Sequence, residues 1–230
     1  WSSDVCSSDL EQNRFPEERK TTGPIPLQAP DQDIKKPKTQ TLLLNGTDKT
    51  APPLILKSMA LETISSYPEN AIHAYTDGSA VRAIRNGGYG SVINAPDLEE
   101  PILLSGPCGA YCTNYDAELV AIQKTLDTIF QHLEDGKLEV KDIVLFSDSQ
   151  SVIQAVENWQ DGEAKGIENI IQTSDKILRL YGKEITIQWI PGHSDISMND
   201  QADKLAKTGS HMQQHMVKAQ NVFNYFPAIS

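Results

Sequence analysis

The stretch Ile72–Ser79, with the sequence IHAYTDGS, decides the fold, because a short apolar run there ends in one carboxylate and a glycine. Its length and its apolar and aromatic residues predict a β-strand, with Asp77 at the end of a central strand where a sheet opens onto solvent. Three more acids and one histidine occupy suggestive positions further along the chain: Glu118, Asp148, Asp203 and His193. These five residues are the candidate functional set.

Length and composition limit the possible functions. The chain has 230 residues and 39% hydrophobic content, which suits one globular domain with extensions. Its formal net charge of −11 argues against a free-standing, high-affinity nucleic-acid binder, since such proteins carry a basic face. We therefore expect only weak attraction of this domain for a nucleic-acid backbone.

The cysteines and the apolar runs bear on localisation. Cys6, Cys108 and Cys112 have no set of zinc-binding partners nearby, which favours a reduced, intracellular protein of the nucleus or cytoplasm. No apolar run approaches the roughly eighteen residues of a membrane helix, and the first thirty residues lack the order of a secretion signal. We expect no membrane role.

Changes in composition divide the chain into five parts. Residues 1–10, WSSDVCSSDL, resemble the translation of a sequencing-library adapter and are excluded from the fold. Residues 11–53 are rich in Pro, Thr, Lys, Gln and Asp, which is typical of a linker or disordered segment. Residues 54–70 predict a short helical lead-in, residues 71–209 the main domain, and residues 210–230 a C-terminal extension.

The order of elements in the main domain predicts its architecture. Three strands come first, and the glycine-rich second one, near residues 87–93, allows close approach of another backbone or a ligand. Strands and helices then alternate, with capping-box spacing at Thr113 and Asp116 and again at Ser197 and Asp200. We predict an α/β fold with a mixed five-stranded sheet, its first three strands antiparallel, and helices on both faces.

The four acids indicate a metal site. Gathered at strand ends and helix starts, they would repel one another strongly unless cations lay between them. Oxygen ligands without cysteine or paired histidine favour two Mg²⁺ ions, with Mn²⁺ as an alternative. Taken singly, each acid also fits a common role as a turn former, a helix-dipole partner or a solvated residue.

His193 follows Pro191 and Gly192 in an expected loop. It is either an inert surface residue or a functional group that transfers a proton to the leaving group or helps the product to depart, because the ordinary pKa of histidine lies near neutrality.

At these residues the chain resembles ribonuclease H type 1. The matching stretches are Thr76–Ser79, Asn114 with Ala117–Leu119, Ser147–Gln150, and Trp189–His193 with Asn199 and Asp203. The resemblance covers about residues 71–209 and is greatest to the domain that follows reverse transcriptase in jockey-type non-LTR retrotransposons.

The resemblance implies a ribonuclease H-like fold and cleavage of the RNA strand of an RNA–DNA hybrid. It makes Asp77, Glu118, Asp148 and Asp203 the metal ligands, with His193 assisting. Asn114 matches a position that contacts the hybrid near the 2′-hydroxyl, the group that distinguishes RNA from DNA. Gly78, Ser79 and Ser149 are further expected substrate contacts.

One departure from the family concerns substrate binding. The basic, tryptophan-bearing protrusion of some bacterial members is absent, since the stretch from Trp159 to Gly166 is short and acidic. An upstream reverse transcriptase region is therefore the expected source of substrate affinity, through effective concentration.

Two other functions remain open at this point. One is a DNA-cutting enzyme of the integrase or resolvase type with a similar acidic cluster, although such enzymes generally lack the Pro-Gly-His loop. The other is a non-catalytic domain that only positions nucleic acid, although all five candidate positions are intact.

Overall fold

A computed structural model describes residues 34–160 and 164–214 of the chain. The adapter-like segment 1–10, residues 11–33 of the expected linker and most of the expected C-terminal extension lie outside the described residues. The strands are β1 Lys38–Gln40, β2 Ile72–Val81, β3 Arg85–Asn94, β4 Ile102–Tyr111, β5 Ile143–Ser147 and β6 Ile185–Trp189. The helices are α1 Pro53–Ser66, α2 Asn114–Glu134, α3 Gln150–Asn158, α4 Lys165–Tyr181 and α5 Ser197–His211, with a 3-10 turn η1 at Leu44–Gly46.

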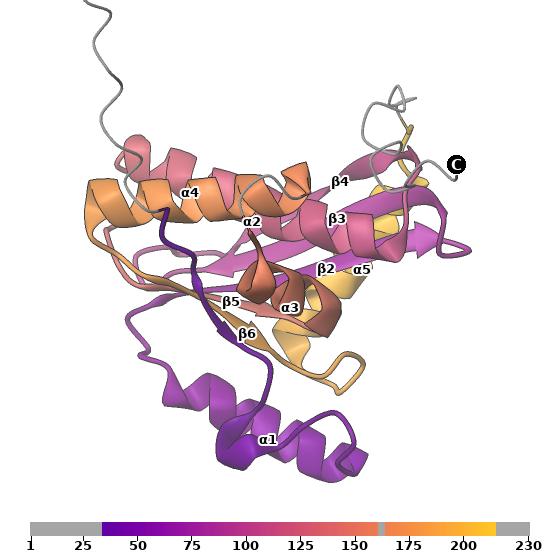
Figure 1. The fold of residues 1–230 in the computed structure, drawn as a ribbon, viewed down its shortest axis with the longest axis horizontal. Coiled ribbons are helices and arrows are strands. Elements are labelled where there is room, and N and C mark those ends of the chain that lie inside the picture. The colour runs from indigo at the N-terminus through magenta and orange to yellow at the C-terminus, as the bar shows by residue number, and fades with distance from the viewer. Residues whose placement is uncertain (1–33, 161–163, 215–230) are drawn as a thin grey trace, which may run out of the picture. The chain divides into compact units, whose positions relative to one another are not determined.

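One mixed sheet forms the centre of the domain, with the strand order β1-β6-β5-β2-β3-β4 (Figure 1). The β2–β3 and β3–β4 pairs are antiparallel, as predicted for the first three strands of the domain. The β2–β5, β5–β6 and β1–β6 pairs are parallel. The predicted α/β architecture with a mixed sheet is therefore confirmed.

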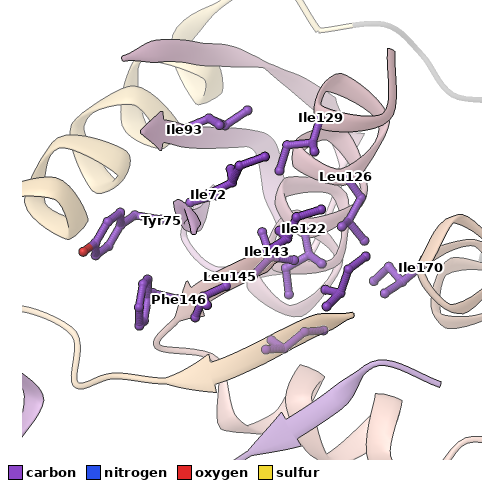
Figure 2. Close-up of a cluster of buried hydrophobic side chains, with 14 of the residues drawn as sticks. Ile72, Tyr75, Ile93, Ile122, Leu126, Ile129, Ile143, Leu145, Phe146 and Ile170 are labelled. Atoms are coloured by element: carbon purple, nitrogen blue, oxygen red, sulfur yellow. The ribbon is translucent and has the colours of Figure 1, made fainter. Parts of the chain in front are cut away.

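Alternating side chains give the sheet two buried faces. On the first face, Ile72 of β2 and Leu145 of β5 are fully buried with Ile122 and Leu126 of α2 and Ile170 of α4, and Figure 2 shows them in one cluster. Helices α2, α3 and α4 group together on this side (Figure 1). This cluster fixes α2 on the sheet, and α2 carries Glu118 at its start.

Helix α5 covers β2, β3 and β4 on the second face, and glycines allow it to lie very close. A Cβ atom at Gly90 would lie 2.1 Å from the Ala202 carbonyl oxygen, and one at Gly88 would lie 2.0 Å from the Ser210 nitrogen. The glycine-rich strand therefore admits another backbone, which was one of the two predicted reasons for its glycines. This packing brings α5, and with it Asp203, over the centre of the sheet.

Helix α1 packs against the hydrophobic core through Ala60, Leu56 and Ile64, and the residue after it meets β5 and β6. The ring of Tyr67, the residue after α1, meets the ring of Phe146 edge to face with 5.7 Å between centroids. The Tyr67 hydroxyl donates a 2.7 Å hydrogen bond to Oε1 of the buried Gln188, and Ala60 is fully buried. The short helix predicted for this region is thus an integral layer of the domain.

The prediction of five strands is wrong, because the sheet has six. The additional strand, β1, lies within the range assigned to a linker and pairs with β6, with Lys38 opposite Thr186 and Gln40 opposite Gln188. Three residues reading Lys-Thr-Gln carry no recognisable apolar alternation, so only the tertiary contact with β6 makes them a strand.

Two local predictions about element ends are also wrong. Strand β2 does not end at Asp77 but continues to Val81, because its second half pairs with β3 as one arm of a hairpin. Helix α5 is preceded by Ile196 and has no side-chain cap, so Ser197 and Asp200 do not form a capping box. The capping box of Thr113 and Asp116 at the start of α2 is confirmed.

Within the described ranges, no helix combines the length and the apolar character that a membrane span requires.

Candidate active site

Asp77 and Asp148 lie side by side because two parallel strands end their pairing there. Strand β5 ends at Ser147, which pairs with Thr76 of β2. Asp77 is therefore the first β2 residue beyond the pairing with β5, and Asp148 is the first residue after β5. The Asp77 side chain lies on the face covered by α5, since Asp77 pairs with Gly90. Only 7% of Asp77 is exposed to solvent.

Glu118 reaches the same place from the first turns of α2. The Thr113 capping box fixes the start of the helix, and Gly78 allows its backbone to lie against β2. The backbone amide of Gly78 donates a hydrogen bond to the Glu118 carboxylate, an interaction that lowers its pKa. One oxygen of this carboxylate, Oε2, is buried and has no hydrogen-bond partner among the described residues.

Together Asp77, Glu118 and Asp148 form a tight carboxylate triad. Each offers an oxygen, and these three oxygens lie within 4.8 Å of one another. Burial and then the charges of Asp148 and Asp203 raise the pKa of Asp77 to about 8, while Lys207 acts in the opposite direction. Burial, followed by the charges of Asp148 and Asp77, also raises the pKa of Glu118 well above its usual range.

Asp203, the fourth predicted ligand, borders the triad without belonging to it. Its carboxylate forms an ion pair with Lys207, one turn further along α5, with 2.6 Å between Oδ2 and Nζ. Its charge still contributes to the raised pKa values of Asp77 and Asp148. The structure therefore brings three of the four predicted acids together and places the fourth next to them.

The loop between β6 and α5 brings His193 to Asp148. His193 is exposed and has a left-handed backbone with φ of 50°. Burial raises the pKa of Asp148, and the His193 charge is the largest opposing influence. A Cβ atom on Gly192 would lie 2.2 Å from Oδ2 of Asp148, so this glycine is what allows the loop to approach the carboxylate.

The predicted substrate-binding residues surround the triad. Oδ1 of Asn114 accepts a 2.9 Å hydrogen bond from the Ala80 amide, which ties the start of α2 to the β2–β3 hairpin. Ser79 is partly buried on β2, beside Gly78. Ser149 directly follows Asp148, and its amide donates a 3.1 Å hydrogen bond to Ser147 Oγ. Their contact with substrate stays a prediction.

Sequence reasoning missed two features beside the triad. The first is the Asp203–Lys207 ion pair, which the i, i+4 spacing of the two residues on a helix indicates. The second is a hollow next to Asp148, to which Lys49 and Leu56 from the N-terminal region contribute. No local pattern indicates that second feature, since it depends on tertiary packing.

A family model described as RNase H matches residues 69–211, which is more than half of the chain. The chain belongs to the RNase H family. The ribonuclease HI of Helicobacter pylori is 30% identical to this RNase H chain over 140 residues, covering 59% of the chain and 90% of the relative. A ribonuclease H from an Acidovorax species is 29% identical over 151 residues, covering 61% of the chain and 95% of the relative.

A solved structure is similar as well. The RNase H1 of the halophilic archaeon Halobacterium salinarum aligns with a TM-score of 0.45 and 23% identity, covering 60% of this RNase H chain and 96% of the other. Family membership, with relatives named ribonuclease H, confirms the prediction that the chain is an enzyme of the ribonuclease H type, an endoribonuclease of RNA–DNA hybrids.

The triad of this RNase H chain fits a divalent cation. Two buried carboxylates and the half-buried one of Asp148, with oxygens within 4.8 Å of one another, are unfavourable when all are ionised, and a cation offsets that repulsion. The unpartnered Oε2 of Glu118 supplies a free ligand atom. An all-oxygen set is suited to hard cations of the Mg²⁺ type.

Proposed function

We propose that this domain hydrolyses the RNA strand of RNA–DNA hybrids with two divalent cations, Mg²⁺ or Mn²⁺, held by Asp77, Glu118, Asp148 and Asp203. The observation that carries the proposal is the close approach of the Asp77, Glu118 and Asp148 carboxylates, with the buried Oε2 of Glu118 left without a partner among the described residues. When bound, such cations activate a water for attack on a phosphodiester and stabilise the leaving oxyanion.

The protein residues have distinct roles in this proposal. Asp77, Glu118 and Asp148 hold their oxygens in place before the substrate arrives, because β2, β5 and α2 are all fixed by the core. Asp203, next to the triad and paired with Lys207, would be the fourth ligand. His193, next to Asp148 but exposed to solvent, delivers a proton to the leaving oxygen.

Selectivity for RNA requires polar contacts at the minor groove, where the 2′-hydroxyl lies. Gly78, Ser79, Asn114 and Ser149 are the proposed contacts, since they flank the triad on β2, at the start of α2 and after β5. We also propose the retrotransposon context, with an upstream reverse transcriptase that supplies affinity for the hybrid. Its support is the sequence resemblance and the acidic net charge of −11.

A reducing, intracellular environment is part of the same proposal. Cys108 and Cys112 support it, because both are free thiols.

The decisive experiment compares two isosteric substitutions at opposite ends of β5. Asp148→Asn is expected to abolish Mg²⁺-dependent cutting of a labelled hybrid and leave the circular dichroism spectrum unchanged. Asp142→Asn, at an exposed aspartate just before β5, is the matched control and should cut normally.

The substrate arm of this experiment uses duplex DNA of the same sequence. Cutting of the duplex but not of the hybrid would support an integrase-type nuclease instead. No cutting of either substrate by the unsubstituted chain would support a non-catalytic positioning domain. Hybrid cleavage that survives Asp148→Asn would refute the metal site.

A further inference from the structure

Residues 34–67, here called the N-terminal extension, precede the family match at residues 69–211 yet form part of the domain. Besides β1 pairing, two side-chain amides hold the extension, one from β6 and one from the start of α3. Nε2 of Gln188 donates to the Leu42 carbonyl at 3.0 Å, and Nε2 of Gln150 donates to the Thr41 carbonyl at 3.1 Å. The extension is therefore fixed beside the segment that contains Asp148.

The same extension contacts the loop that carries His193. Nζ of Lys57, on α1, lies 3.2 Å from Oδ2 of Asp195, two residues beyond His193. The extension thus contacts the segment that follows β5 and the loop that follows β6. Both lie at the end of the sheet where Asp148 is found. It forms one side of the region around Asp148.

A hollow of about 470 Å³ lies where the extension meets these two segments. Asp148 and the hydroxyl-bearing Ser149 and Ser151 line it after β5, and Gly192 lines it beside the His193 loop. The extension contributes Lys49, from the turn between η1 and α1. An ammonium group and two hydroxyl-bearing side chains are suited to bind a phosphate.

Lys49 differs from the other lysines of this region. Lys207 is paired with Asp203 and Lys57 with Asp195, whereas Lys49 forms no ion pair within the described part of the chain. The neighbouring Asp48 carboxylate is instead bound by the amide and hydroxyl of Thr50, at 2.8 and 2.6 Å. The charge of Lys49 makes only a minor contribution to the lowered pKa of Asp48.

We propose that Lys49 binds a backbone phosphate of the nucleic acid beside the cleavage site, so that the N-terminal extension is part of the substrate-binding surface. This inference rests on the proposed function, since it requires a hybrid lying across the triad. It supplies a positive contact from the extension in a chain of net charge −11, which otherwise attracts nucleic acid weakly.

The test measures hybrid binding by fluorescence anisotropy in EDTA, where no cutting occurs, at several KCl concentrations. Lys49→Ala should lower the slope of log affinity against log salt by about 1, as expected for the loss of one phosphate contact. At low salt its Kd should rise by about two- to fivefold, and that of Lys49→Glu by more. Lys183→Ala is the matched control. Lys183 precedes β6, at the end of this strand opposite the loop that carries His193, so its substitution should change neither the salt slope nor the Kd.

Two further measurements separate substrate binding from structure. Cleavage kinetics in Mg²⁺ should show a raised KM with unchanged kcat for Lys49→Ala, and its melting temperature should stay the same. If the unsubstituted chain binds and cuts the hybrid but Lys49→Ala keeps its salt slope and KM, the role of Lys49 is refuted and the proposed function stands. If the unsubstituted chain neither binds nor cuts the hybrid, both proposals are refuted.

Discussion

The backbone of Gly78 lies directly against that of Glu118. A Cβ atom at position 78 would lie 2.2 Å from the Glu118 nitrogen and 2.4 Å from the Ala117 carbonyl carbon. Both obstacles are backbone atoms, which cannot rotate away as a side chain can. Gly78 therefore sets the distance between β2, which carries Asp77, and the helix that carries Glu118.

Gly78→Ala should push the start of α2 away from β2. We expect a loss of about 1–3 kcal/mol in the free energy of unfolding, as for other overpacked sites, measured by urea denaturation. Cleavage of the hybrid should fall by more than tenfold, because the Glu118 carboxylate moves out of the triad. Gly166→Ala is the control, since its nearest neighbour would be Leu119 Cδ1 at 3.5 Å. Equal effects of the two substitutions would contradict this explanation.

The stability of the metal-free protein should fall as pH rises. The pKa of Asp77 is about 8 in the folded chain against an ordinary 3.8, so the folded state retains a proton that the unfolded state has lost between these values. The contribution of this Asp77 proton to the free energy of unfolding is fully present below pH 4 and disappears as pH rises through 8. Thermal melts in EDTA from pH 4 to 8 should show this fall, and a flat or rising profile would contradict it.

Asp77→Asn should weaken that pH dependence, because an amide stays neutral in both states. At pH 8 without metal, the substituted chain should be more stable than the unsubstituted one by about 1–3 kcal/mol, since each pKa unit corresponds to about 1.4 kcal/mol. Added Mg²⁺ should raise the melting temperature of the unsubstituted chain and have little effect on the substituted one. A substitution that destabilises at pH 8 would rule out strong repulsion within the triad.

We expect Lys207 to compete with cations for Asp203, because the two side chains form a 2.6 Å ion pair. Lys207→Met should free Asp203 and shift half-maximal Mg²⁺ activation to a lower concentration by about two- to fivefold, the range for an exposed pair. Lys204→Met is the control, at a lysine that lies on the same helix. A rise in the Mg²⁺ requirement would mean that Lys207 assists the site rather than competing with it.

The Tyr67 hydroxyl is a sensitive probe of how α1 is held. Tyr67→Phe removes the hydrogen bond to Gln188 and leaves the buried Oε1 without this donor, so a loss of about 1–3 kcal/mol is expected in urea denaturation. Tyr181→Phe, at the last residue of α4, is a control for the same chemical change. Unchanged stability after Tyr67→Phe would mean that α1 contributes little to the domain.

The parts of the fold that the sequence predicted are those with local signals. Thr113 and Asp116 lie three residues apart, so their capping box is legible without tertiary information. Asp148 was placed beside the end of its strand because five apolar or small residues precede it. By contrast, β1 depends on β6, and Asp77 lies within a strand whose length depends on β3.

The residues of the candidate site also divide into those indicated by local sequence signals and those that depend on tertiary contacts. Asp77, Glu118 and Asp148 come together as expected, because each is fixed by an element that the sequence indicates. Asp203 is paired with Lys207, and the i, i+4 spacing that allows this pair is visible in the sequence. The hollow beside Asp148 was invisible, because Lys49 is far from Ser149 in sequence and meets it only through packing.

The short strand β1 has a consequence for self-association. Without it, the five residues of β6 would offer a row of free backbone groups to which a strand of another molecule could add. The three residues of β1 pair with β6, so the exposed edge of the sheet is a strand of three residues instead of five. A chain that begins after residue 40 should therefore form aggregates more readily at high concentration than one that keeps it.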